Sequence, residues 1–232
     1  DKKANKSAAD RFTTGLVNID EDAAPVDGGT LVVGEYSEAR SMDPTKTYTN
    51  GAAGGSALLA VYDSLMAYDW ETKTFVPRMA ESLESPDKTV WTLKLRDDVT
   101  FTDGTKLDAD AVIGSIEYYV SKYGYNFIQW MLNVKDVKKI DNSTVQFTTK
   151  FPWATFPNML AHGPGVIMAP AAYADPEAFK PIGAGPFVFE SYSPAESLIL
   201  KANPKYFNGA PKLDKIKFVW PGGDPAKVEA LT

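Results

Sequence analysis

Alternation of apolar and other residues is the clearest pattern in this chain, and it is strongest at residues 89–95. Trp91, Leu93 and Leu95 occupy every second position there. A period of two residues is typical of a strand with one buried face. Comparable apolar runs bounded by turn residues predict further strands at 30–36, 165–169, 186–192, 196–202 and 215–220, a short hairpin or turn at 67–77 and a hairpin at 138–149.

A spacing of three to four residues marks the expected helices. One lies near 55–66, where four apolar residues, Leu58 and Tyr62 among them, share one stripe. A second begins after Asp108, whose side chain is a favourable N-cap, and a third is expected at 171–179. Antiparallel hairpins with interspersed helices predict an α+β (mixed α/β) fold.

Composition narrows the classes of partner. The 232 residues are 44% hydrophobic, which is enough for a substantial core. The formal net charge of −6 disfavours nucleic acid and anionic membrane surfaces, which attract clustered Lys and Arg. The sequence also lacks a run of about 18 apolar residues, so we expect no membrane span.

Candidate catalytic chemistry is sparse. The chain has no cysteine and one histidine, His162, so thiolate catalysis and histidine-rich metal sites are excluded. Asp108 and Asp110 lack the spacing of a calcium loop, and the glycine-rich stretch 51–55 lacks a phosphate-binding pattern. We therefore expect no enzyme activity, cofactor or metal.

Four stretches carry a family signature. They are GGTLVVGEYSEARSMDP, VYDSLMAYDWETKTFVPRMAESLESPDKTVWTLKLRDDVTFTDGTKLDADAV, PIGAGPF and ANPKYFNGAPKLDKIKF. In this order they resemble the extracellular solute-binding proteins of family 5, which serve oligopeptide, dipeptide and nickel ABC importers. Departures from the family pattern include Asp63 in place of Glu, Ala184 in place of Thr and Phe207 in place of Trp.

The resemblance implies a type II periplasmic-binding-protein-like fold of cluster C. It implies a first lobe at 29–220, with a core sheet from about 29–66 and 181–220 and an inserted subdomain at about 67–180. Residues 221–232 would begin the crossover to a second lobe, and neither that lobe nor the C-terminal return is in this sequence. The polar, acidic residues 1–28 are expected to form a flexible tether, because they bury too little apolar surface to offset ordering.

Ligand in this family lies between the lobes, and peptide members hold it largely by main-chain hydrogen bonds. The positions that match the cleft wall lie in a loop at 47–53, in an aromatic segment at 123–132 and near 161–165. The candidate ligand-binding residues are Tyr48, Asn50, Gly51, Ala52, Tyr123, Tyr125, Trp130 and His162. An ordinary loop explains the first group equally well, and core packing is the competing explanation for Trp130.

The resulting hypothesis is the substrate-binding component of an ABC importer that captures a peptide or similar small solute. Its partners would be that solute, an ABC permease and the second lobe, at an extracytoplasmic location. Membrane attachment would come only through a lipid anchor upstream of Asp1. The alternative is a stand-alone sensory or protein-interaction module on the same fold.

Overall fold

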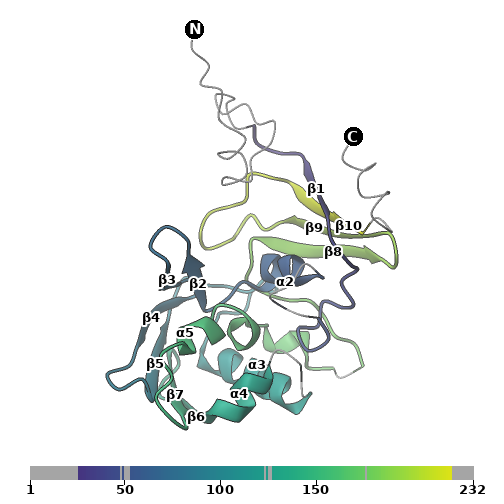
Figure 1. The fold of residues 1–232 in the computed structure, drawn as a ribbon. Helices are drawn as coiled ribbons and strands as arrows, with labels where there is room; N and C mark the ends of the chain where they lie inside the picture. Colours follow the sequence, from purple (N-terminus) through teal and green to yellow (C-terminus); the bar gives the residue numbers. More distant parts are fainter. Residues whose placement is uncertain are drawn as a thin grey trace, which may run out of the picture.

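Two four-stranded sheets form the framework of the computed structural model, which describes residues 26–47, 49, 53–122, 124, 127–175 and 177–220. The first sheet has the spatial order β1 (Thr30–Gly34), β10 (Lys215–Val219), β9 (Ser197–Ala202) and β8 (Phe187–Ser193). Strand β1 pairs in parallel with β10, and the other pairs are antiparallel. Strands from both ends of the chain therefore lie side by side (Figure 1).

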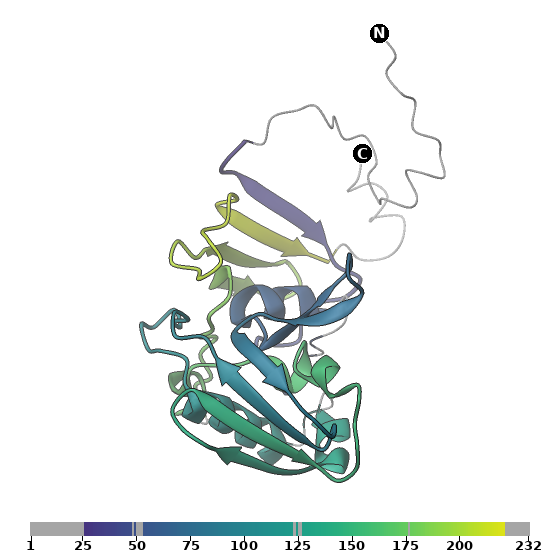
Figure 2. The ribbon, with the colours of Figure 1, turned by 90° about the vertical axis from the view of Figure 1, so that its left-hand side faces the viewer.

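The second sheet is antiparallel throughout and lies at the other end of the molecule (Figures 1 and 2). Its order is β4 (Ala80–Glu84), β5 (Val90–Leu95), β7 (Thr144–Thr149) and β6 (Val134–Lys139). Trp91, Leu93 and Leu95 of β5 are all buried on one face. The alternation seen in the sequence is thus confirmed as the inward face of a sheet.

Helices and a small hairpin lie between and beside these sheets. Helix α2 (Gly55–Tyr62) packs on β8, whereas α3 (Ala109–Ser121) and α4 (Ile128–Asn133) cover the second sheet at β6. The hairpin of β2 (Met66–Asp69) and β3 (Thr74–Pro77) contacts the short helix α5 (Phe156–Met159). Two 3₁₀ turns, η2 (Gly163–Gly165) and η3 (Pro170–Ala172), follow in the chain.

The core is divided into two clusters that match the two sheets. One joins the second sheet to α3, α4 and α5, and it includes Leu93, Val112, Trp130, Phe147 and Phe156. The other joins α2 to the first sheet, and it includes Leu58, Tyr62, Leu198, Leu200 and Phe218. Burial of apolar surface is the main stabilising contribution in both.

Several expectations from the sequence are confirmed. The side chain of Asp108 caps α3 by accepting the backbone N–H of Ala111 at 2.8 Å. Gly104, in the turn after Asp103, has φ +92°, a conformation that glycine adopts without strain. The hairpins at 67–77 and 138–149 are present, and the fold is mixed α and β as predicted.

Three predicted elements are wrong in extent or type. The first helix ends at Tyr62 instead of residue 66, because Asp63 has φ +61°. Residues 165–169 form no strand beyond a single bridge from Val166 to Ser64, although the apolar run is buried. The helix predicted at 171–179 is limited to η3, and the Asp175 side chain instead accepts the N–H of Glu177.

The C-terminal end of α2 is held by the backbone of residues 183–185. Its last carbonyl groups accept N–H bonds from Gly185 (to Val61, 2.9 Å) and Ala184 (to Tyr62, 3.4 Å). The approach is so close that a Cβ atom at Gly183 would lie 2.3 Å from the Val61 carbonyl oxygen. Glycine in the PIGAGPF segment is therefore a packing requirement.

An ion pair between the buried Asp63 and the partly exposed Arg78 lies next to this junction. The Asp63 carboxylate is almost fully buried and accepts hydrogen bonds from the Arg78 Nε and the Tyr206 hydroxyl, the latter at 2.5 Å. Arg78 also donates from Nη2 to the Tyr206 hydroxyl at 2.8 Å. Burial, followed by the charge of Asp63, raises the pKa of Tyr206 to about 12, so this phenol stays a donor.

We predict that Gly183→Ala lowers the free energy of unfolding by about 1–3 kcal/mol, because the new methyl group would overlap the α2 backbone. Gly34→Ala is the matched control, since no atom lies within 4 Å of the Cβ it would add, and its effect should stay within about 0.5 kcal/mol. Urea unfolding followed by circular dichroism measures both. Equal effects of the two substitutions would contradict the close-packing account.

Candidate functional site

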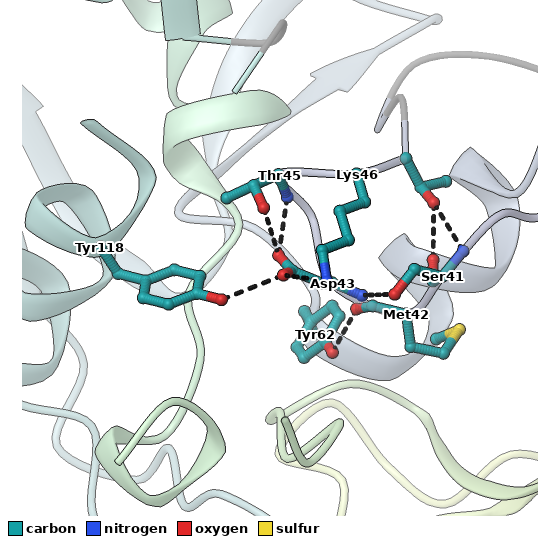
Figure 3. Close-up of polar contacts among 8 residues, drawn as sticks. Ser41, Met42, Asp43, Thr45, Lys46, Tyr62 and Tyr118 are labelled. Atoms are coloured by element: carbon teal, nitrogen blue, oxygen red, sulfur yellow. Dashed lines mark hydrogen bonds and ion pairs between the residues drawn. The ribbon is translucent and has the colours of Figure 1, made fainter. Parts of the chain in front are cut away.

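The loop between β1 and α2 is fixed by the buried carboxylate of Asp43 (Figure 3). Its Oδ1 accepts hydrogen bonds from the backbone N–H and the hydroxyl of Thr45, at 2.9 and 2.8 Å. Its Oδ2 accepts the hydroxyl of Tyr118, which reaches across from α3, at 3.0 Å. The carboxylate therefore joins a local turn to a helix about 75 positions away in the chain.

Further bonds hold the same loop on α2. The Tyr62 hydroxyl donates to the Met42 carbonyl oxygen at 2.6 Å. The Thr47 hydroxyl donates to the Ser41 carbonyl oxygen at 2.6 Å and accepts the Ser41 N–H at 3.1 Å. Burial, and then the charge of Asp43, raises the pKa of both Tyr62 and Tyr118, so both phenols remain donors.

Thr49 connects the second half of this loop to the segment that carries His162. Its side chain is buried, and its hydroxyl accepts the backbone N–H of Gly163 at 2.8 Å. His162 precedes η2 with an extended backbone (φ −157°), and its carbonyl accepts the N–H of Gly165. Two segments separated by more than 100 residues thus meet at Thr49 and His162.

Beside this contact lies a hollow of about 400 Å³, which we call the aromatic hollow. Its lining residues come from the loop before α2, from α2, from the β2–β3 hairpin and from the segment at α5. They are Thr49, Leu59, Tyr68, Trp70, Phe75, Asn158, Ala161 and His162. The lining therefore combines aromatic, aliphatic and polar side chains.

Partial burial lowers the pKa of His162 below its ordinary value of 6.5. The imidazole is consequently neutral at pH 7, with one nitrogen available as donor and the other as acceptor. Such a group suits hydrogen bonding to an uncharged polar partner. It does not supply a positive charge.

The structure places two of the sequence-predicted site residues. His162 lines the aromatic hollow, whereas Trp130 is 3% exposed and packs its ring on Phe147 and Phe156 at centroid distances of 5.5 and 5.8 Å. Trp130 also borders a separate groove of about 620 Å³ between α3, α4 and β6. The other candidates, Tyr48, Asn50, Gly51, Ala52, Tyr123 and Tyr125, lie outside the described residues.

The hairpin at 67–77 was predicted, but its aromatic side chains were not among the candidate site residues. Tyr68 lies in β2 and Trp70 in the turn that follows it, and the two aromatic residues of MAYDW were available as a signal. Thr49, inside the predicted 47–53 loop, was also passed over. Thr49 belongs to the site because its hydroxyl accepts the N–H of Gly163, and a contact between such distant residues cannot be predicted from the neighbouring sequence.

In the part of the chain that the structure describes, no three His, Asp or Glu side chains come together as a metal site. No helix there has both the length and the apolar character that crossing a bilayer requires.

Similarity to known proteins assigns the family. Residues 74–231 match the model of the bacterial extracellular solute-binding proteins, family 5 (middle part). The chain belongs to this family. Its members are solute-binding proteins rather than enzymes, and the resemblance found in the sequence motifs is confirmed.

Individual family members agree in sequence and in fold. Di/tripeptide-binding protein 2 of Pseudomonas aeruginosa (strain UCBPP-PA14) is 32% identical over 215 residues, covering 81% of this chain and 40% of that protein. The binding protein AgaA of A. tumefaciens R10, in complex with agropinic acid, superposes with a TM-score of 0.77 at 30% identity, covering 88% of this chain and 42% of that one.

A third similar protein is the periplasmic binding protein DppA of Helicobacter pylori in complex with the peptide STSA. It has a TM-score of 0.76 and 27% identity, and the match covers 89% of this chain and 45% of that one. The predicted fold class, mixed α/β of the periplasmic-binding-protein type, is thus confirmed. The chain spans about 40% of the length of the family members that it matches.

We predict that Asp43→Ala destabilises the protein by about 2–3 kcal/mol, because it leaves the buried Thr45 N–H and the Tyr118 hydroxyl without their acceptor. Lys46→Ala is the control, since the Lys46 ammonium is exposed and 3.9 Å from the same carboxylate, and it should cost less than about 1 kcal/mol. Denaturant unfolding of both variants is the measurement. A larger loss in Lys46→Ala than in Asp43→Ala would refute this ranking.

The lowered pKa of His162 predicts that the free energy of unfolding depends on pH. Its pKa is lower in the folded than in the unfolded protein, so the unfolded chain binds more protons as the pH falls below about 6.5. Wild type should therefore lose more unfolding free energy than His162→Gln between about pH 7.5 and pH 5. The unfolding free energy of each protein is measured by urea titration at each pH. If it depends on pH equally in wild type and in His162→Gln, His162 is not desolvated in solution.

Proposed function

We propose that this chain forms the first lobe of a solute-binding protein that captures a short peptide for an ABC importer. In this proposal residues 29–220 constitute the lobe, with the first sheet as its core and about 67–180 as the inserted subdomain. The wall of the ligand cleft is made by the 47–53 loop together with His162. The protein acts outside the cytoplasm and makes or breaks no bond in its ligand.

One contact carries the assignment of the site. The Thr49 hydroxyl accepts the N–H of Gly163 at 2.8 Å, which brings the two loops expected at the cleft wall into one surface beside a hollow. These loops were selected from separate parts of the sequence, 114 residues apart at this contact. Their convergence on one hollow supports a shared role in binding.

A peptide is the proposed ligand for two reasons. The 32%-identical protein is named for binding di- and tripeptides, and one structural neighbour holds the peptide STSA. The lining of the hollow includes Asn158 and a neutral His162, which suit the amide groups of a peptide backbone. Another neighbour holds agropinic acid, so solutes of this kind are the competing class.

The proposed mechanism requires a second wall. A ligand that contacts two lobes stabilises the closed arrangement, which an ABC permease then engages. Contacts from this lobe alone supply only part of the binding free energy, so we expect weak, millimolar-range affinity for the isolated chain, on the order of −4 kcal/mol.

The test is direct binding of a pool of di- and tripeptides to the 232-residue chain, followed by ligand-observed NMR. We predict measurable binding to the wild-type chain. Thr49→Val should weaken this binding by about tenfold, because the buried Gly163 N–H loses its acceptor and the two loops are no longer held together at this point. Thr148→Val on β7 is the matched control, since Thr148 lies outside the aromatic hollow.

Two results would count against the proposal. Absence of binding to any peptide at about 10 mM, with a folded chain, would reject a peptide-binding wall. Equal weakening by Thr49→Val and Thr148→Val would reject the assignment of the wall to Thr49 and His162.

A further inference from the structure

The β2–β3 hairpin presents three aromatic rings at one side of the aromatic hollow. Tyr68 and Trp70 meet edge to face at 4.8 Å between ring centroids, and Tyr68 and Phe75 at 5.2 Å. Trp70 is nevertheless 82% exposed. A large ring that is positioned by its neighbours and left open to solvent is typical of a contact surface.

The hairpin that carries these rings is firmly held. At its tip the Asp69 carboxylate accepts the N–H groups of Glu71 and Thr72 at 2.8 and 3.3 Å. At its base the Met66 N–H donates to the Leu160 carbonyl at 2.8 Å. The hairpin that carries the aromatic rings is thus fixed to α5 and to the segment between α5 and His162. Little conformational entropy remains to be lost when a ligand contacts them.

The remaining lining residues are a mixture of apolar and polar side chains. Leu59 and Ala161 add apolar surface, and Asn158 and His162 add hydrogen-bonding groups, whereas the Thr49 side chain is buried and its hydroxyl accepts the Gly163 N–H. None of the eight lining side chains is an Asp, Glu, Lys or Arg, although the chain as a whole has a formal net charge of −6. A charged group would therefore lose hydration here without gaining an ionic partner.

The volume fits one side chain and its adjoining amides. About 400 Å³ is at the small end of the range of ligand sites, about 300–1,000 Å³, and is too little for a whole oligopeptide. An apolar side chain in contact with the aromatic rings would have Asn158 and His162 in the same hollow as hydrogen-bonding groups for its flanking amides.

We propose that the aromatic hollow is a side-chain subsite that selects a peptide residue with an aromatic or large aliphatic side chain. This inference rests on the proposed peptide-binding function and adds the class of side chain that is preferred. Trp70 is its principal specificity-determining residue, with Tyr68 and Phe75 as supports. Small or charged side chains gain little there.

The experiment compares the tripeptides Ala-Phe-Ala, Ala-Ala-Ala and Ala-Lys-Ala on the 232-residue chain by ligand-observed NMR. The expected result is about tenfold tighter binding of the phenylalanine peptide than of the other two. In Trp70→Ala this ratio should fall to about threefold or less, and Trp70→Phe should keep most of it. Phe151→Ala is the matched control, because Phe151 is 49% exposed and lies outside the hollow.

The outcomes separate this inference from the proposed function. If the three peptides bind equally, or if Trp70→Ala and Phe151→Ala alter the ratio alike, the subsite is refuted while peptide binding stands. If none of the peptides binds, the proposed function fails and the subsite fails with it. A ratio that depends on Trp70 and not on Phe151 supports the subsite.

Discussion

The fold depends on the C-terminal end of helix α2, where four distant segments meet. The helix stops because Asp63 turns into a positive φ, and its last carbonyl groups are then satisfied by the amides of residues 184 and 185. The same Asp63 binds Arg78 and Tyr206. Because a buried charge is stable only with its partners, this junction sets the direction in which the chain enters the β2–β3 hairpin and leaves β9.

The junction also determines the candidate site. Helix α2 carries Leu59 on one side of the aromatic hollow, and Tyr62 holds the loop before the helix through the Met42 carbonyl. Asp43 ties that loop to α3, and Thr49 ties it to Gly163. The hollow is therefore assembled from segments that are each fixed elsewhere by buried hydrogen bonds. Its geometry depends on these buried hydrogen bonds as well as on the residues that line it.

Much of the fold could be predicted because its signals are local. The alternation in 89–95 and the cap at Asp108 need only neighbouring residues, and both were correct. The errors at 165–169 and 171–179 have different causes. Tertiary packing buries the apolar run at 165–169 without strand pairing, and the Asp175 side chain forms a local turn within 171–179. The site was harder, because the Thr49–Gly163 contact and the exposure of Trp70 arise only when distant segments pack together.

Charge and shape together favour one physical mode of recognition. An acidic chain with an uncharged hollow cannot draw its ligand in by opposite charge at that point. Affinity must then come from apolar contact with the rings and from hydrogen bonds to neutral groups, both of which are weakly sensitive to salt. Binding of this kind discriminates modestly by side-chain size and disfavours a buried charge. If the chain binds peptides as proposed, the uncharged lining predicts a preference for uncharged side chains at this hollow.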